Sequence, residues 1–241
     1  LSRSDHPLLK QIMQQAPGTY QHSLQVANLA EQAAQVIGAD ALLTRVGAMY
    51  HDAGKSINPS FFIENQVPGN IDSHDDMDPV IAAQTIIEHV QNGLSLAEKY
   101  RLPPRLMDFM REHHGTQITR YQFNRAVEQQ NGDISKVDTE LFRYPGPKPQ
   151  TKETGILMLA DGCEARARSD LPKNEEQLKV IVKKVFDYVI GEELLNNTNL
   201  TLRDLTLIQE SFVNTLSNTY HARIQYPEIK PRPSTPSPSQ K

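Results

Sequence analysis

The chain has 241 residues, enough for one large domain or two small ones, and its composition (38% hydrophobic, 22% charged) is ordinary for a soluble globular protein. A net charge of −4 and an aromatic content of 6% without tryptophan argue against a general DNA- or RNA-binding surface, so no nucleic-acid partner is expected. The single cysteine excludes an intrachain disulfide framework, and no apolar run reaches the roughly 20 residues that cross a bilayer. Because the chain opens with the mostly polar LSRSD and lacks an initiator methionine, we expect a piece of a longer protein.

Helical periodicity dominates the first half of the chain. Gly38 is a predicted C-terminal cap, Asp78-Pro79 predicts an N-cap followed by a proline in the first turn, and Pro103-Pro104 opens a further helix. The predicted helices of this half cover about 8–13, 24–37, 40–51, 78–89 and 104–114.

The second half begins with an interruption of the helical pattern, a loop rich in proline and glycine around 145–149. Helical character resumes over 156–161, and two further helices are predicted at about 174–190 and 202–222. No alternating apolar strands joined by tight turns are found, so the predicted fold is all-α, with a single helical domain over 1–226. The remaining 227–241 are rich in proline and serine, which predicts a disordered tail.

Imidazoles and carboxylates recur where the predicted apolar stripes stop. A lone histidine is most often a surface or hydrogen-bonded core residue, and we interpret His6 and His221 in that way. Chance is a weaker explanation for the other histidines, because several of them lie at the ends of predicted helices. We therefore expect a convergent polar cluster that includes His51, Asp52, His89, His113, His114 and Asp161.

The chemistry of this cluster fits a centre with two metal ions. Imidazole and carboxylate ligands without a thiolate favour iron or manganese over a structural zinc site. A carboxylate can bridge two cations about 3.5–4 Å apart, and such a pair lowers the pKa of bound water and holds phosphoryl oxygens. The negative net charge is no obstacle, because the metals supply the local positive field.

Three of these residues, together with His22, stand in the order H…HD…D: His22, His51-Asp52 and Asp161. In this the chain resembles the HD superfamily of metal-dependent phosphohydrolases. More narrowly, it is similar to the cytoplasmic HD domain of the PgpH-type, seven-transmembrane HD proteins over about 6–222. The stretches that carry this similarity are PGTYQHSLQVANLAEQAA at 17–34, VGAMYHDAGK at 46–55, FFIENQVPGN at 61–70, HVQNGLSLAEKYRLPPRLMDFMREHHGT at 89–116 and YPGPKPQTKETGILMLADGCEARARS at 144–169.

The resemblance implies a phosphodiesterase that hydrolyses cyclic di-AMP to linear pApA by in-line attack of a metal-bridging hydroxide. It also implies a cytoplasmic domain of a cell-membrane protein, attached to the membrane only through a transmembrane region that this chain lacks. It makes no prediction of the oligomeric state. Carried over residue by residue, it assigns one metal to His22, His51, Asp52 and Asp161 and the second to His89, His113 and His114, with Asp52 bridging.

Further residues are candidates for catalysis or substrate contact. Lys55, close to Asp52, is expected to neutralise charge on the substrate or product beside the metals. His74, Tyr144 and Arg166 are candidate substrate contacts, although each is also an ordinary residue of a surface, a rigid proline loop or a solvated helix face.

Several functions stay open at this point. The substrate could instead be cyclic di-GMP, (p)ppGpp or a dNTP, although the Gly-Tyr-Pro signature typical of the cyclic di-GMP branch does not follow the paired histidines. The domain could also be a non-catalytic nucleotide sensor. A helical interaction domain with incidental histidines is the third alternative, and metal content would distinguish it.

Overall fold

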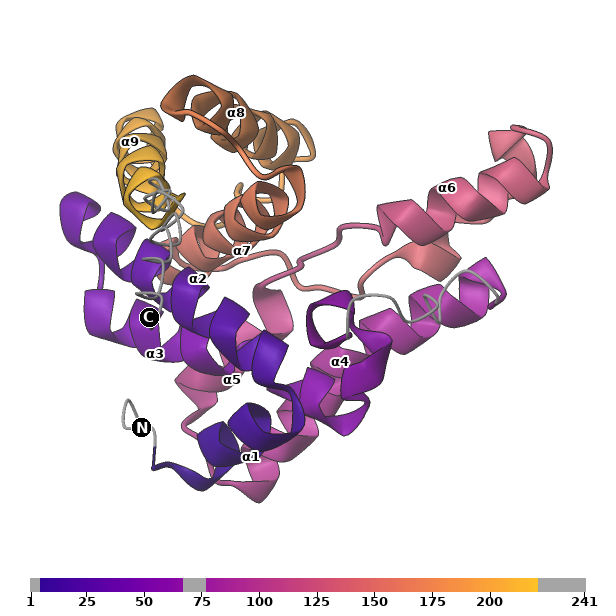
Figure 1. Cartoon of the computed structure of the whole chain (residues 1–241), viewed down its shortest axis with the longest axis horizontal. Coiled ribbons are helices and arrows are strands. Elements are labelled where there is room, and N and C mark those ends of the chain that lie inside the picture. Colours follow the sequence, from indigo (N-terminus) through magenta and orange to yellow (C-terminus); the bar gives the residue numbers. More distant parts are fainter. Residues whose placement is uncertain (1–4, 67–76, 221–241) are drawn as a thin grey trace, which may run out of the picture.

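The computed structural model describes residues 5–66 and 77–220, and these are arranged as helices around a common core (Figure 1). Apart from an isolated bridge between Ile118 and Arg143, the described ranges contain no β-structure, which confirms the all-α prediction. The predicted tail at 227–241 lies outside the described residues. The α-helices are α1 Pro7–Gln15, α2 Pro17–Ile37, α3 Ala41–Tyr50, α4 Pro79–Lys99, α5 Pro104–Glu112, α6 Arg120–Gln129, α7 Lys152–Asp170, α8 Glu175–Gly191 and α9 Leu202–Tyr220.

Short 3-10 helices connect several of these elements. They are η1 Ala53–Ile57, η2 Pro59–Phe61, η3 Ile63–Asn65, η4 Ile134–Lys136 and η5 Thr139–Phe142. The first three follow α3 directly, and η1 packs closely on α4.

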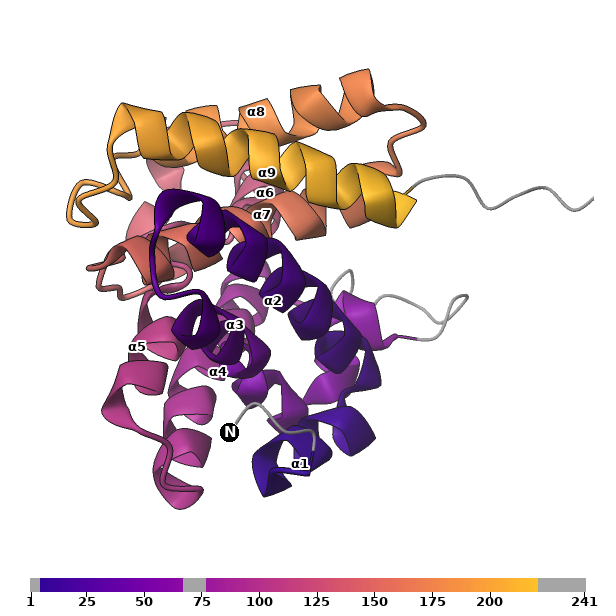
Figure 2. The same ribbon diagram turned by 90° about the vertical axis from the view of Figure 1, so that its left-hand side faces the viewer.

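Helix α2 is the centre of the arrangement, since it packs against α3, α7 and α9. Helices α7, α8 and α9 form a group of their own on one side of α2, and α9 crosses over α2 in the turned view (Figures 1 and 2). Helices α4 and α5 lie on the other side, and α4 and α6 together form an arm that extends from the body (Figure 1). The main core cluster runs through nearly all of these helices and contains fully buried Tyr50, Phe109 and Phe212.

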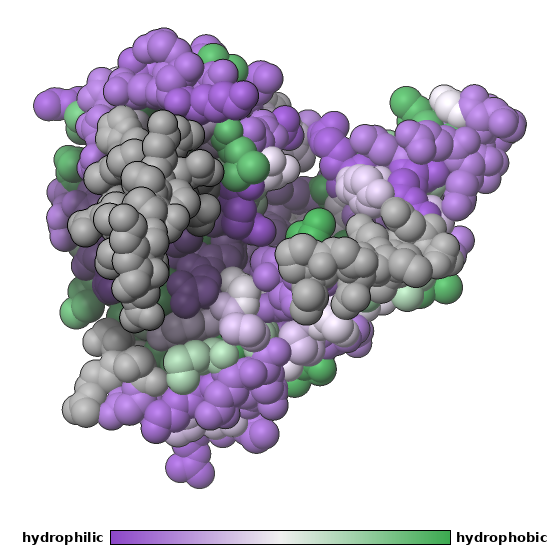
Figure 3. Space-filling model, in the orientation of Figure 1, coloured by the Kyte–Doolittle hydropathy of each residue, from purple (hydrophilic) through white to green (hydrophobic). Residues whose placement is uncertain are grey.

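The surface is largely hydrophilic on the face shown in Figure 3, with hydrophobic side chains in separate patches. In the part of the chain that the structure describes, no helix combines the length and apolar character needed to span a membrane.

The end of α2 and the start of α4 are determined by the residues at those positions, as the sequence predicts. Gly38 adopts a left-handed conformation (φ 70°) and ends α2, because only glycine enters this region without steric cost. The Asp78 side chain accepts hydrogen bonds from the first backbone N–H groups of α4, and Pro79 occupies the first helical position. Both predicted signals are confirmed.

Several helices, α2 and α7 among them, extend beyond their predicted bounds, and one helix was missed. Helix α4 does not end at His89 but continues to Lys99, so His89 lies in its middle. The sequence reading also missed α6, of which only Gln122 and Ala126 are buried, because its sequence RYQFNRAVEQ contains few strongly apolar residues.

Candidate metal centre

The structure brings all seven predicted ligands into one buried cluster where α2, α3, α4, α5 and α7 meet. The ligands come from elements far apart in the chain. Helix α2 supplies His22, the junction of α3 and η1 supplies His51 and Asp52, α4 supplies His89, the end of α5 supplies His113 and His114, and α7 supplies Asp161.

Asp52 lies between two groups of imidazoles. Its Oδ2 atom is 3.6 Å from His22 Nε2 and 3.3 Å from His51 Nε2. Its Oδ1 atom is 3.3 Å from His89 Nε2 and 3.6 Å from His113 Nε2. One carboxylate oxygen thus faces each group, which is the arrangement of a bridging ligand for two cations.

The first ligand group, as we call it, consists of His22, His51 and Asp161 together with Asp52 Oδ2. Asp161 Oδ1 lies 3.0 Å from His22 Nε2 and 3.8 Å from His51 Nε2. The Asp161 side chain is 15% exposed, whereas that of Asp52 is 1% exposed. Asp161 therefore marks where this group can be reached from outside.

The second ligand group consists of His89, His113 and His114 together with Asp52 Oδ1. Their ligand atoms all lie within 4.8 Å of one another. The adjacent His113 and His114 can both point inward because α5 ends just before them and Gly115 turns the chain with a φ of 54°. The predicted helix over about 104–114 thus ends at Glu112, just before the two histidines.

Three of the imidazoles are oriented by the backbone. The Nδ1 atoms of His51, His89 and His113 lie 2.7, 2.6 and 2.9 Å from the carbonyl oxygen three residues earlier in the chain. A carbonyl only accepts, so Nδ1 carries a proton and Nε2 is the ring nitrogen that is left to bind a metal. The local helical geometry thereby fixes the tautomer that ligation needs.

His22 is oriented differently, by a carboxylate that the sequence reading missed. Its Nδ1–H donates to Glu164, which is fully buried, and Arg168 Nε lies 3.3 Å from the other oxygen of Glu164. A carboxylate behind an imidazole raises its basicity as a ligand. The spacing of Asp161 and Glu164 places both on one face of α7, and this was the signal available in the sequence.

Lys55 reaches the centre between two carboxylates. Its Nζ atom lies 2.8 Å from Asp52 Oδ2 and 3.1 Å from Glu64 Oε1. The same Glu64 oxygen accepts a hydrogen bond from Thr19 Oγ1 at 3.1 Å. Burial alone would lower the pKa of Lys55, but Asp52 and Glu64 outweigh it and raise that pKa, so the side chain stays charged.

The two ligand groups differ in their electrostatics. Burial alone would lower the pKa of His22 and His51, but the nearby carboxylates outweigh it and raise these values to about 9 and about 10. In the second group burial prevails, so the pKa of His113 falls to about 4 and that of His114 falls well below its usual value. Asp52 lies at the boundary, and the charges of His51 and Lys55 hold its pKa well below the usual range in spite of burial.

These residues fit two divalent cations. His51 Nε2 and Asp52 Oδ1 are buried without a hydrogen bond, and a buried polar atom in this state carries a free-energy cost that a cation would remove. The donors are nitrogen and oxygen, while the free Cys163 is a fully buried member of the hydrophobic core.

Gly54 in the YHDAGK stretch has a packing role. A side chain at this position would overlap the backbone of His89 and Gly93, so only glycine allows η1 to lie this close to α4. The contact sets the distance between Asp52 and His89. The sequence reading quoted this glycine but did not predict its role.

The candidate substrate contacts lie at different places. The Tyr144 ring is buried and stacks on His114, with 4.2 Å between ring centroids. Arg166 lies one turn beyond Asp161 on α7 and forms an ion pair with Asp170 at 2.7 Å. His74 lies outside the described residues.

A cavity of about 440 Å³ lies beside the second ligand group. We call it the aromatic cavity, because phenylalanine and tyrosine rings form much of its wall. Its lining includes Lys55, Phe61, Phe62, His89, His114 and Tyr144.

Fold and site together define an all-α protein with a buried centre for divalent metal ions. The chain belongs to the HD domain family, which it matches over residues 19–166. It is 41% identical over 229 residues to the cyclic-di-AMP phosphodiesterase PgpH of Bacillus subtilis, across 95% of this chain and 31% of that protein. The resemblance stated from the sequence is thereby confirmed.

Two solved structures resemble this one closely. Both are of the HD domain of phosphodiesterase PgpH from L. monocytogenes, one of them in complex with cyclic-di-AMP, and both have a TM-score of 0.84. Their identities are 36% and 37%, over 90% and 92% of this chain and 100% of each solved chain. The chain spans about a third of the length of the curated PgpH relatives it matches.

Proposed function

We propose that the chain is the catalytic domain of a cyclic di-AMP phosphodiesterase, which hydrolyses one 3′–5′ phosphodiester of the ring to give linear pApA. One observation carries this proposal: six candidate ligands gather around the Asp52 carboxylate, which faces both ligand groups, in a fold that matches a domain solved with cyclic-di-AMP. The cofactors are two divalent ions, for which iron or manganese is the best match to an N/O donor set.

Two bound cations supply a nucleophilic water at neutral pH and stabilise the charge that develops on the phosphoryl group. The protein's own part is to position these components. Asp52 faces both groups, and the backbone carbonyls hold the imidazoles with Nε2 directed inward. Lys55 Nζ, 2.8 Å from Asp52 Oδ2, places a fixed positive charge where a phosphoryl oxygen beside that carboxylate would lie.

The aromatic cavity supports the assignment of a nucleotide substrate. Aromatic rings provide flat apolar faces on which a base can stack. Tyr144 lies against His114, so a base next to its ring would have its phosphate close to the second ligand group. We therefore assign Tyr144 as a substrate contact.

The proposal is tested by hydrolysis with manganese- or iron-loaded protein, the iron samples being handled without oxygen. We expect rapid conversion of cyclic di-AMP to pApA and slower reaction with cyclic di-GMP, (p)ppGpp and dNTPs. Faster cleavage of the guanine ring would overturn the substrate assignment. Tight binding of cyclic di-AMP by fully metal-loaded protein without any turnover would instead identify a nucleotide sensor.

We also propose that this domain is the cytoplasmic part of a cell-membrane protein. Support comes from the similarity to the PgpH relatives, which belong to the seven-transmembrane HD proteins that the sequence resembles. Protease protection of the full-length protein in oriented membrane vesicles would test it. The HD domain should be cleaved only when the cytoplasmic face is exposed.

A further inference from the structure

Glu64, on η3, is a carboxylate that belongs to neither ligand group. Its side chain is 7% exposed, and its Oε1 atom lies 3.1 Å from Lys55 Nζ, which in turn lies 2.8 Å from Asp52 Oδ2. Burial alone would raise the pKa of Glu64, but the charge of Lys55 outweighs it and lowers that pKa, so the contact is an ion pair. Lys55 therefore lies between two carboxylates, of which only Asp52 is a predicted metal ligand.

Glu64 is itself held by the start of α2. Its Oε1 atom accepts a hydrogen bond from Thr19 Oγ1 at 3.1 Å. The next residue, Asn65, accepts a hydrogen bond from the Thr19 backbone N–H at 3.1 Å and donates one to Thr19 Oγ1 at 2.8 Å. Thr19 is fully buried and lies three residues before His22, on the same side of the helix. The helix that carries a ligand of the first group thus also fixes the position of Glu64.

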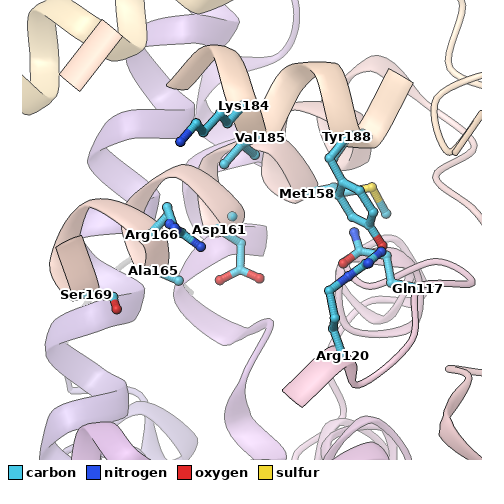
Figure 4. Close-up of a pocket in the computed structure, with 12 residues that line it drawn as sticks. Gln117, Arg120, Met158, Asp161, Ala165, Arg166, Ser169, Lys184, Val185 and Tyr188 are labelled. Carbon is cyan, nitrogen blue, oxygen red and sulfur yellow. The ribbon is translucent and has the colours of Figure 1, made fainter. Parts of the chain in front are cut away.

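The Lys55 side chain lies at one of two cavities that border the centre. Lys55 and Glu64 line the aromatic cavity, and Lys55 Nζ lies 5.2 Å from the centroid of the Phe62 ring. Asp161 borders a different cavity, of about 580 Å³, between the start of α6 and the helices α7 and α8 (Figure 4). Among the described residues that line the aromatic cavity, Lys55 is the only lysine or arginine.

A lysine in this place needs more than one partner. Its ammonium is strongly hydrated and sits on a flexible stem, so an unsupported side chain turns toward water. Asp52 supplies one contact, but its oxygens also face the two ligand groups, and cations bound there would offset its charge and repel the ammonium. Glu64 lies outside both groups, so its charge remains available to Lys55 when the metals are bound.

We propose that Glu64 is a positioning residue for the hydrolysis, which keeps Lys55 beside Asp52 while the metal ions and the substrate are bound. The inference rests on the proposed function. Glu64 acts through Lys55, whose ammonium then faces the phosphoryl oxygen on which negative charge develops. Removal of the Glu64 charge should therefore matter only as long as Lys55 is present.

The first test is a double-mutant cycle between Glu64 and Lys55. Glu64→Gln keeps the shape of the side chain and an acceptor for Thr19 but removes the charge. We expect kcat for cyclic di-AMP to fall roughly tenfold with KM within about twofold of the wild type, because the weakened contact is one made in the transition state. In a Lys55→Met background the same substitution should cause no further loss.

A matched control removes the acid of another ion pair that involves α2. Glu31 Oε2 lies 2.6 Å from Arg45 Nη1, and neither residue belongs to the ligand groups or to the contacts of Lys55. Glu31→Gln should therefore leave kcat at the value of the wild type. Elemental analysis should give the same metal content for this control, for Glu64→Gln and for the wild type.

The second test measures the position of Lys55 without turnover. Metal-loaded protein is acetylated with an amine-specific reagent, and the labelling of Lys55 is followed by mass spectrometry. Lys55 should react slowly in the wild type, because its side chain is 15% exposed and lies in two ion pairs. In Glu64→Gln the rate should rise about threefold or more, because the amine is no longer held. Lys183, which is 66% exposed, is the internal reference and should react equally in both proteins.

The outcomes decide between a positioning and a merely structural role. An equal fall in kcat with and without Lys55, unchanged labelling of Lys55 in Glu64→Gln, or a loss of metal that accounts for the fall in kcat would each overturn the proposal. If the metal-loaded wild type does not hydrolyse cyclic di-AMP, the proposed function fails. The labelling experiment then still decides whether Glu64 holds Lys55.

Discussion

The two ligand groups of the metal centre differ in the chemical type of their ligands and of the groups that orient them. The first includes two carboxylates, Asp161 as well as Asp52, and a third, Glu164, supports His22 from behind. The second consists of imidazoles around one Asp52 oxygen, supported by backbone carbonyls. The first environment therefore contains three carboxylates, whereas the second contains only the one that it shares.

This difference predicts the relative affinity of the two groups for their cations. Negative charge in a buried site favours a divalent cation, so the first ligand group should bind its metal more tightly. In the second group His113 and His114 are in the neutral form that ligation requires, because burial lowers the pKa of both. Binding of a cation by the second group therefore depends more on Asp52, which is its only carboxylate and is shared with the first group.

The largest effect should come from Asp52→Ala. Removal of the bridge takes one anionic ligand from each group, so we expect loss of the second metal, weakened binding of the first, and a fall in phosphodiesterase activity of about a thousandfold or more. Elemental analysis measures the metal content of the variant, and steady-state kinetics measure its activity. Undiminished turnover by this variant would contradict the two-metal centre.

A pair of single-ligand variants compares the groups directly. His114→Ala should leave close to one metal ion per chain, because the first ligand group is intact. Asp161→Ala should weaken the tighter site, with activity in both variants falling about a hundredfold or more. Equal metal loss in the two variants, measured by titration calorimetry, would remove the distinction between the groups.

Gly54→Ala tests the packing that joins the groups. The added methyl would displace α4, which carries His89, from η1. We expect a loss of about 1–3 kcal/mol in the free energy of unfolding, together with reduced occupancy of the second metal. Gly191→Ala, where a side chain meets nothing within 4 Å, is the control and should unfold in urea like the wild type.

The smallest effect is expected for Glu164→Gln. The amide keeps the shape but removes the charge behind His22, so affinity for the first metal should fall about 10- to 100-fold while the second is unaffected. Glu153→Gln, at the start of the same helix and outside the cluster, serves as the control. Metal titration that shows weaker binding at the second group instead would contradict the assignment of Glu164 to His22.

Several helix ends could be predicted from the sequence alone. Gly38 and Asp78-Pro79 mark helix ends through their own backbone preferences, and their predictions are confirmed. The long apolar stripes predicted the helices of the core. Helix α6 was missed because it buries few residues, and the continuation of α4 beyond His89 was missed because a histidine within an apolar stripe was read as its end.

By itself, the sequence determined which side chains could serve as ligands, through residue type, order along the chain and family resemblance. Only the tertiary structure decided that Asp52 faces both groups, that Glu164 supports His22 and that Gly54 must be a glycine. The physical reason is that helix caps and periodicity are properties of neighbouring residues. Distances between side chains of α2, α4, α5 and α7 depend instead on how the whole core packs.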